Sequence, residues 1–572
     1  MNYKIIYENP QSGYIKIKAE FNADSNTTIQ FPTWRPGRYE IGDFIKNVHG
    51  FKVFSADGKP LKHEKINKDS WQVENSKGVI RVEYSYYAKD LNAGSTYVDQ
   101  EQLYVNPVNC LAYIPGFEDQ ACELELGIPD HWEIACGLPF SAKKLKTDSY
   151  HDLVDSPFIA SNTLQHETYE SNGTTFHLWF QGECKPDWKK LKTDFKKFTD
   201  LQVKNFGSIP VKGEYAFLFQ IVPYKAYHGV EHQYSTVILL GPSYDIMGSF
   251  YDELLGVSSH ELYHTWNIKN IRPIEMFPYE YSKENFSTLG YVAEGVTTYM
   301  GDIYLMQSGV WDLDKYLKEL QSNLQRHFDN FGRFNLSVAE SSWDTWIDGY
   351  VAGVPNRKVS IYNEGAILAF VCDMKIRKNS GNKFNLHDVM TDLYENFGQK
   401  GKGYSVEDYQ KTVEKYAGEN LDSFFKDYFF GTASYETIIE EALDTIGYEF
   451  KSETAEKASW SRLGIKTVVE NNQTIVKAIY PGSSSEVAGI MIDDEVSAVN
   501  GMRVSGDLDN WISYFENDNL QLTIYRKSNQ MVFDIPELNR AYFPKFSIIE
   551  QKTAAKDSLF MRKWWSTGKR NK

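Results

Sequence analysis

The stretch SSHELYHTWN, residues 258–267, determines how this sequence is interpreted. It contains the pattern His-Glu-X-X-His, with His260 and His264 four residues apart. Positions four apart share one face of an α-helix, so both imidazoles can reach one metal ion. Glu261 follows the first histidine and can act on a water molecule without being a ligand. The stretch therefore predicts a catalytic site with Zn2+ as cofactor and Glu261 as general base.

The residues around the motif favour a helix over 251–267. Leu254, Leu255 and Val257 supply an apolar side, and Pro273 is predicted to end the run. The alternative is a helix whose two histidines are merely packed or solvated. Chance alone produces the motif on the order of once in fifty chains of this kind. We therefore favour the metal site.

A catalytic zinc ion needs a third protein ligand. The segment GYVAEGVTTY, residues 290–299, places Glu294 in apolar, helix-prone surroundings, where an unpaired carboxylate is costly. Glu275, Glu280 and Glu284 also follow the motif, but they lie in a loop rich in proline and tyrosine. We predict that Glu294 is the third ligand. The alternative is an exposed glutamate at the start of a helix.

The spacing of apolar residues predicts a multidomain α+β protein. Residues 1–170 alternate with the period of half-buried strands and predict a β-sandwich-like domain. Residues 171–450 are dominated by helical patterns, with a strand-like passage at 214–240. Residues 455–540 return to short strands with glycine-rich turns, and 541–572 form a tail that ends in the basic run KRNK.

Within the second part, apolar residues recur with the helical period in several segments. Gly381 is predicted to stop one of these helices. Helices are predicted at 251–267, 292–308, 313–331, 362–378 and 420–430.

Composition excludes several classes of protein. The chain is 42% hydrophobic, which is ample for packed cores. The net charge of −16 argues against nucleic acid or anionic membrane as a partner. The N-terminus lacks the apolar region of a signal peptide, and no run of about 18 apolar residues could span a membrane. Cytoplasmic location is the default expectation.

Five cysteines are present, none with Cys-X-X-Cys spacing, so neither a zinc knuckle nor a disulfide framework is indicated. Buried free thiols are the favoured interpretation. One bridge among Cys110, Cys122 and Cys136 stays open as the alternative.

Several segments match a single family: FPTWRPG at 31–37, HELYHTWN at 260–267, IRP at 271–273, EG at 294–295 and YNEG at 362–365. Together they resemble the glycyl aminopeptidase family of PDZ-containing zinc metallopeptidases, relatives of the thermolysin-like gluzincins. The resemblance implies a β-rich N-terminal domain, a mainly helical thermolysin-like catalytic domain and a C-terminal PDZ domain. It also implies an aminopeptidase that removes glycine or alanine from peptides with a free amino terminus.

The same resemblance assigns further site residues. GVEH at 229–232 looks like an edge strand that runs along the substrate, with Gly229, Glu231 and His232 as substrate-binding residues. The resemblance implies that Glu231 binds the free α-ammonium of the substrate and that Tyr362 donates a hydrogen bond to the developing oxyanion. The alternatives are an ordinary strand-edge charge for Glu231 and a packed tyrosine for Tyr362.

The segment SRLGI at 461–465 resembles the loop by which PDZ domains receive a carboxylate on backbone N–H groups. PGSSSEVAGI at 481–490, followed by DEV at 494–496 and VNG at 499–501, strengthens this resemblance. It implies a PDZ ligand, although the domain could instead only brace the catalytic cleft.

Two other functions remain open. One is an endopeptidase of the same fold, in which Glu231 has no ammonium to bind. The other is a PDZ scaffold with a dormant peptidase domain, which is disfavoured because every residue that the chemistry requires is present.

Overall fold

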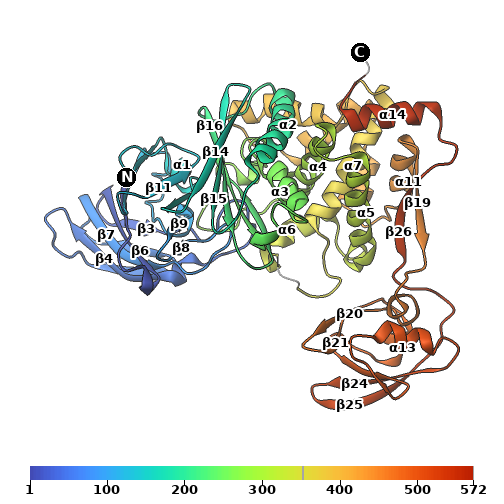
Figure 1. The fold of residues 1–572 in the computed structure, drawn as a ribbon. Helices are drawn as coiled ribbons and strands as arrows, with labels where there is room; N and C mark the ends of the chain where they lie inside the picture. Colours follow the sequence, from blue (N-terminus) through green and yellow to red (C-terminus); the bar gives the residue numbers. More distant parts are fainter. Residues whose placement is uncertain (351–352, 571–572) are drawn as a thin grey trace.

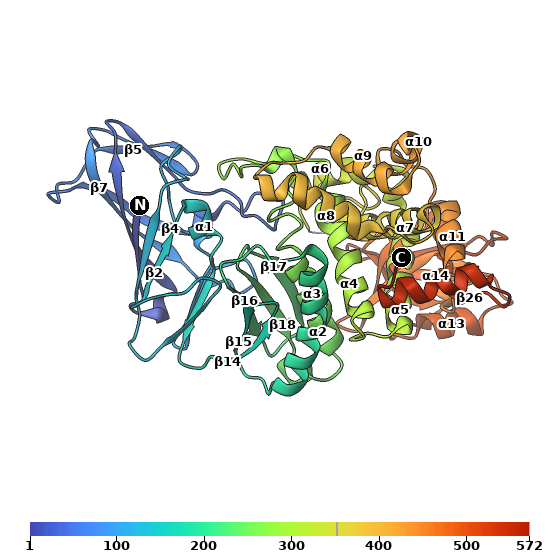
Figure 2. The same ribbon diagram turned by 90° about the horizontal axis from the view of Figure 1, so that it is seen from above.

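The computed structural model describes residues 1–350 and 353–570. Asn571 and Lys572, part of the basic run predicted for the tail, lie outside the described residues. The β sheets of the N-terminal region form one end of the molecule, and the helices form the other, with a further sheet between them (Figures 1 and 2). A small C-terminal sheet domain lies to one side of the helices (Figure 1).

The N-terminal region consists of three β sheets around one apolar core. In its long strands β2 and β7 every second side chain is buried, as the alternating sequence predicts. The predicted β-rich first region is thus confirmed. The six-stranded sheet has the order β12 (Lys144–Thr147), β10 (Cys122–Gly127), β1 (Asn2–Ile6), β2 (Tyr14–Ala23), β7 (Gly78–Tyr87) and β4 (Val48–Ser55). The two smaller sheets are β3 (Thr27–Gln30), β6 (Ser70–Val73) and β5 (His63–Asn67), and β11 (Glu133–Cys136), β13 (Phe158–Ser161), β9 (Gln102–Val105) and β8 (Tyr97–Val98).

The central sheet provides the edge along which the candidate site is built. Its strands β15, β16 and β18 run parallel, and β17 lies antiparallel at the edge beside β18. Strand β14 falls within the range predicted for the first domain but pairs with β15 of this sheet. In sheet order the strands are β14 (Gln165–Ser171), β15 (Thr174–Gln181), β16 (Glu214–Ile221), β18 (Ser235–Gly241) and β17 (Ala226–Glu231).

The middle region is mainly helical, as predicted, and its helices share a large apolar core with the central sheet. Helix α3 packs beside both β17 and α4. Besides the short α1 (Tyr150–Val154) and α10 (Asp422–Phe424), the helices are α2 (Trp188–Phe206), α3 (Tyr251–Tyr263), α4 (Thr297–Gln307), α5 (Leu313–Asp329), α6 (Val338–Asp348), α7 (Ile361–Ser380), α8 (Leu386–Asn396), α9 (Val406–Ala417) and α11 (Glu436–Thr445).

Two predicted helix ends have different outcomes. Gly381 caps α7 in the left-handed conformation, with φ of 61°, as predicted. The prediction that Pro273 ends the motif helix is wrong, because α3 already ends at Tyr263. After it the chain forms tight turns, in which the N–H groups of Thr265 and Trp266 bond to carbonyls only three residues back.

The C-terminal sheet domain is inserted between two paired strands. The chain leaves the helical region after β19 (Tyr448–Glu453) and returns through β26 (Lys545–Glu550), its antiparallel partner. Between them lies a separate apolar core. The elements of this domain are β20 (Ile465–Glu470), β21 (Gln473–Ile479), α12 (Ser484–Ala488), β22 (Glu495–Val499), β23 (Met502–Arg503), α13 (Leu508–Tyr514), β24 (Leu520–Arg526) and β25 (Asn529–Ile535).

After β26 the tail forms α14 (Lys556–Thr567), which docks on α4. Trp565 is fully buried there, and its indole Nε1 donates to the hydroxyl of Tyr299 at 3.2 Å. All five cysteines are free thiols. Among the described residues, no helix has the length and apolar character needed to cross a membrane.

Candidate active site

Helix α3 brings the two motif histidines together at its C-terminal end. His260 lies in the last turn and His264 directly follows the helix, and their Nε2 atoms are 2.9 Å apart. The ring Nδ1 of His264 donates to the carbonyl oxygen of Asn267 at 3.0 Å. In the neutral imidazole this bond keeps the proton on Nδ1, which leaves the lone pair of Nε2 facing His260.

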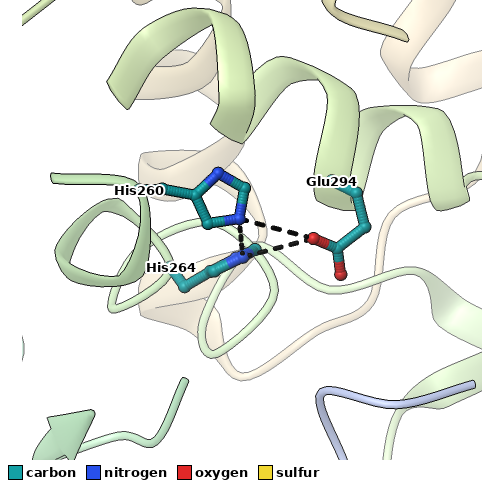
Figure 3. Close-up of side chains that lie close together, drawn as sticks. All are labelled: His260, His264 and Glu294. Carbon is teal, nitrogen blue, oxygen red and sulfur yellow. Dashed lines mark hydrogen bonds and ion pairs between the residues drawn. The ribbon is translucent and has the colours of Figure 1, made fainter. Parts of the chain in front are cut away.

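Glu294 approaches the histidines from a π-helical turn, Tyr291–Val296, that leads into α4. Its Oε2 lies 3.6 Å from Nε2 of His260 and 3.3 Å from Nε2 of His264 (Figure 3). The amide of Asn267 donates to the carbonyl oxygen of Val292 at 2.8 Å, so the turn after α3 is tied to the turn that carries Glu294. The predicted ligands therefore converge.

These residues fit a metal ion. The three facing atoms are separated by 2.9, 3.3 and 3.6 Å. Atoms bound to zinc at about 2.0–2.1 Å in a tetrahedral arrangement would lie roughly 3.3–3.4 Å apart. The field at the site also favours a cation: burial opposes the charged form of His264, but neighbouring carboxylates, led by Glu294, raise its pKa to about 10. Two imidazoles and one carboxylate are a donor set typical of catalytic zinc.

Glu261 lies beside this triangle without belonging to it. Its side chain is buried, and its Oε2 has no hydrogen-bond partner in the part of the chain that the structure describes. A Cβ atom at Gly229 on β17 would lie 2.1 Å from Glu261 Oε1, so only glycine lets the strand approach this closely. Burial, helped by the carboxylates of Glu231 and Glu294 and opposed by His264, raises the pKa of Glu261.

Glu231 ends the edge strand β17 and is a second buried carboxylate of the site. Among the described residues, its Oε1 has no hydrogen-bond partner. One ligand atom each of Glu231, Glu261 and His264 lies within 4.8 Å of the others. Burial, opposed by His264 and aided by Glu294, raises the pKa of Glu231. Such a group would be stabilised by a cationic partner.

The other predicted site residues occupy different positions. Tyr362, in the first turn of α7, lines the same cleft, and its ring centroid is 6.3 Å from that of His260. His232 is absent from the lining of the cleft among the described residues. Its Nδ1 instead lies 3.0 Å from the carboxylate of Asp155.

The site opens into a cleft of about 610 Å³. We call the part of its lining around the buried Glu231 and Glu294, with Gly37, the closed end, and the part around Asp302 and the more exposed Lys315 the open end. A cleft of this size accommodates a short peptide segment or a comparable small molecule.

Gly37 and Tyr39, to which the sequence pattern assigned no role, lie against the carboxylates of the closed end. The hydroxyl of Tyr39 donates to Glu294 Oε1 at 2.9 Å, although 255 positions separate the two residues. The local signals were the family-like stretch FPTWRPG at 31–37 and the density of arginine, glycine and tyrosine in residues 34–39. No periodicity in the sequence predicts a contact over that separation.

Comparisons with known proteins agree with this geometry. A family model described as the peptidase M61 N-terminal domain matches residues 2–162, and one described as M61 glycyl aminopeptidase matches residues 253–368. The crystal structure of an aminopeptidase N family protein from Idiomarina loihiensis is 26% identical, covers 99% of this chain and 100% of its own, and has a TM-score of 0.90.

Two further solved structures are less similar. A mutant M1 zinc metallopeptidase from Deinococcus radiodurans, bound to a Tyr-Ser-Ala substrate, is 11% identical, covers 76% of this chain and 94% of its own, and has a TM-score of 0.49. Native yeast LTA4 hydrolase is 12% identical, covers 77% of this chain and 67% of its own, and has a TM-score of 0.44. Among curated proteins no match was found.

Proposed function

Because this chain belongs to the M61 glycyl aminopeptidase family, we propose that it is a zinc-dependent aminopeptidase that removes glycine or alanine from the amino terminus of peptides. The observation that carries the proposal is the pair of buried carboxylates, Glu231 and Glu261, beside the triangle of His260, His264 and Glu294. One carboxylate is needed to move a proton and the other to bind a substrate ammonium.

His260, His264 and Glu294 would hold the zinc ion. When bound there, zinc polarises the scissile carbonyl and lowers the pKa of a water molecule. Glu261 takes a proton from the attacking water and then delivers it to the leaving amine. Burial raises the pKa of Glu261, and a raised pKa favours the step in which the carboxyl group returns the proton.

Tyr362 and Glu231 act on opposite sides of the scissile bond's carbonyl carbon. The Tyr362 hydroxyl donates a hydrogen bond to the carbonyl oxygen as negative charge develops on it. Glu231 binds the α-ammonium and so places the first peptide bond, rather than a later one, beside Glu261. This fixed register makes the enzyme an exopeptidase.

We further propose that residues 455–540 form a PDZ domain that braces the helical region. Gly464, with φ of 70°, ends the turn before β20, where the family likeness places the carboxylate loop. That turn is in contact with the returning chain, since Tyr542 N–H donates to the carbonyl oxygen of Ser461 at 3.1 Å. Lys466 on β20 forms an ion pair with Asp329 at the end of α5. These contacts support a bracing role.

The substrate proposal is tested with a panel of aminoacyl amides and their N-acetylated forms. We expect Gly and Ala amides to be cleaved faster than Leu or Phe amides, and acetylated substrates to be cleaved poorly. Cleavage of acetylated peptides at internal bonds at the same rate would replace the aminopeptidase with an endopeptidase. No cleavage of any substrate by the zinc-loaded protein would favour a scaffold with a dormant peptidase domain.

The metal proposal is tested by metal analysis of Glu294→Ala. Two imidazoles alone hold zinc weakly, so zinc content should fall well below one per chain. Glu275→Ala is the matched control, because Glu275 also follows the motif but is exposed. Full zinc occupancy in Glu294→Ala would exclude Glu294 as a ligand.

A further inference from the structure

Residues 34–39 of the N-terminal region cross to the active site and are anchored in the middle region. Trp34 is fully buried, and its ring lies edge-on to Tyr279 and Trp346, with centroids 5.6 and 5.0 Å away. The N–H of Thr33 donates to the carbonyl oxygen of Tyr281 at 2.8 Å. These contacts fix the position of the segment relative to the candidate site.

Gly37 lies against the carboxylate of Glu231. A Cβ atom at Gly37 would be 2.5 Å from Oε2 and 3.1 Å from Oε1, so both oxygens face the glycine backbone at close range. Any side chain at position 37 would displace this carboxylate. The φ of +83° at Gly37 also favours glycine. The glycine backbone therefore limits where the Glu231 carboxylate can lie.

Tyr39, two residues later, contacts the other buried carboxylate of the closed end. Its hydroxyl donates to Glu294 Oε1, which leaves Oε2 to face the two histidines. The blue N-terminal trace runs beneath Glu294 in Figure 3. Hydrogen bonds of this kind orient carboxylate ligands and tune metal affinity.

We propose that residues 34–39 are a working part of the active site, in which Gly37 positions Glu231 and Tyr39 positions Glu294. The helical region would then supply the metal ligands, while the N-terminal region fixes the positions of two active-site carboxylates, Glu231 and Glu294. The role of Gly37 rests on the proposed function, because it matters only if Glu231 binds the substrate ammonium. The role of Tyr39 rests on the metal site alone.

The Tyr39 part is tested by zinc affinity, measured in competition with a chelating dye. Tyr39→Phe removes the hydroxyl and keeps the ring, and should weaken zinc binding by about 10–100-fold. Tyr150→Phe is the matched control, because its buried hydroxyl donates to the carbonyl oxygen of Leu111 at 2.7 Å, away from the site. Thermal melts of both variants establish that they are folded. Equal zinc affinity in Tyr39→Phe and Tyr150→Phe would overturn this part.

The Gly37 part is tested with glycine p-nitroanilide and its acetylated form. Gly37→Ala should raise KM for the free substrate by roughly tenfold, as expected for a weakened charge-assisted contact, with a smaller change in kcat. Gly58→Ala is the control, because Gly58 has φ of +82° and open space around its Cβ position. It reproduces the backbone strain without a clash.

Gly37→Ala in a Glu231→Ala background shows whether the rise in KM comes from displacement of the Glu231 carboxylate or from another effect of the substitution. With the carboxylate gone, Gly37→Ala should cause no further rise in KM. An equal rise in both backgrounds would show that Gly37 does not act through Glu231. If the parent cleaves acetylated substrates as fast as free ones, the aminopeptidase proposal and the Gly37 role fail together. The zinc affinity of Tyr39→Phe still tests the proposed role of Tyr39 independently.

Discussion

The two ends of the cleft differ in how their charges are satisfied. At the closed end, Glu231 and Glu294 are only 3% and 2% exposed and are surrounded by segments far apart in the sequence. At the open end, Lys315 already pairs with Asp252 at 3.3 Å and with Glu319 at 2.8 Å, and all three side chains are partly exposed. The carboxylates of the closed end therefore fit a cation, whereas Lys315 at the open end is already neutralised by its own ion pairs.

This difference indicates where selectivity resides. Buried, unpartnered groups discriminate strongly between ligands, because a wrong ligand leaves them unpaired. Exposed ion pairs contribute little, because water competes with them. We expect the enzyme to be strict about the amino end of its substrate and tolerant of the residues beyond the scissile bond.

The largest effect should come from the centre of the closed end. Glu261→Gln removes the proton-transfer group and should lower kcat by about 10²–10⁴-fold while zinc stays bound. Zinc content and hydrolysis of glycine amides are measured on the same preparation. Glu253→Gln, two turns earlier on α3, is the control and should retain most activity. Loss of zinc from Glu261→Gln would show that Glu261 is a ligand rather than the base.

Tyr362→Phe should have the next largest effect. Losing one donor to the developing oxyanion should lower kcat by about 10²–10³-fold with little change in KM. Tyr350→Phe is the informative comparison, because the Tyr350 ring centroid is 6.4 Å from that of Tyr362. A larger loss in Tyr350→Phe than in Tyr362→Phe would transfer the donor role to Tyr350.

Glu231→Ala tests whether the closed end binds the amino terminus of the substrate. Losing the contact with the α-ammonium should cost about 1.5–3 kcal/mol, or roughly 10–150-fold in kcat/KM for Gly and Ala amides. Acetylated substrates lack the ammonium and should lose far less, so the gap between the two classes narrows. Equal losses for free and acetylated substrates would remove this role from Glu231.

The smallest effect on catalysis is expected at the open end, where Asp302→Asn should change kcat/KM by less than about twofold, because Asp302 is not among the residues that would bind zinc or the substrate ammonium. Its effect on stability should depend on pH. Burial and the Glu319 carboxylate raise the pKa of Asp302 to about 8, so its ionisation opposes folding. That cost begins near the ordinary aspartate pKa of about 4 and is complete above about 8.

Asp302→Asn should therefore raise the melting temperature relative to the parent at pH 9 and leave it nearly unchanged at pH 4. Thermal unfolding at both pH values gives the difference directly. A gain of the same size at pH 4 would show that the carboxylate ionises normally in the folded protein.

The sequence could predict what depends on local spacing. The helix that carries His260 and the alternating strands of the first region follow from periodicity, and Glu294 is predicted from its apolar surroundings and the need for a third ligand. Strand alternation could also have distinguished Glu231 from His232, because neighbouring strand residues face opposite sides. Gly229 and Glu231 share the face toward the cleft, and His232 lies beside Asp155 instead.

The rest depends on contacts that no local pattern encodes. The bond from Tyr39 to Glu294 joins two regions, and its energy is realised only after both have folded. The early end of α3 is another case. It reflects the demands of the tertiary structure, in which the turn after Tyr263 must bring Asn267 to both His264 and Val292. A helical pattern alone does not show at which residue such tertiary contacts end the helix.

The insertion of the C-terminal domain between β19 and β26 has a consequence for synthesis on the ribosome. Strand β26 and helix α14 are translated only after the whole inserted domain, yet β26 packs on α5 and α14 packs on α4, the helix that continues directly from Glu294. Until they emerge, that face of α4 lacks Trp565, and the nascent chain carries an unfinished helical core. Completion of the helical core is thereby delayed until the last part of the chain has been translated.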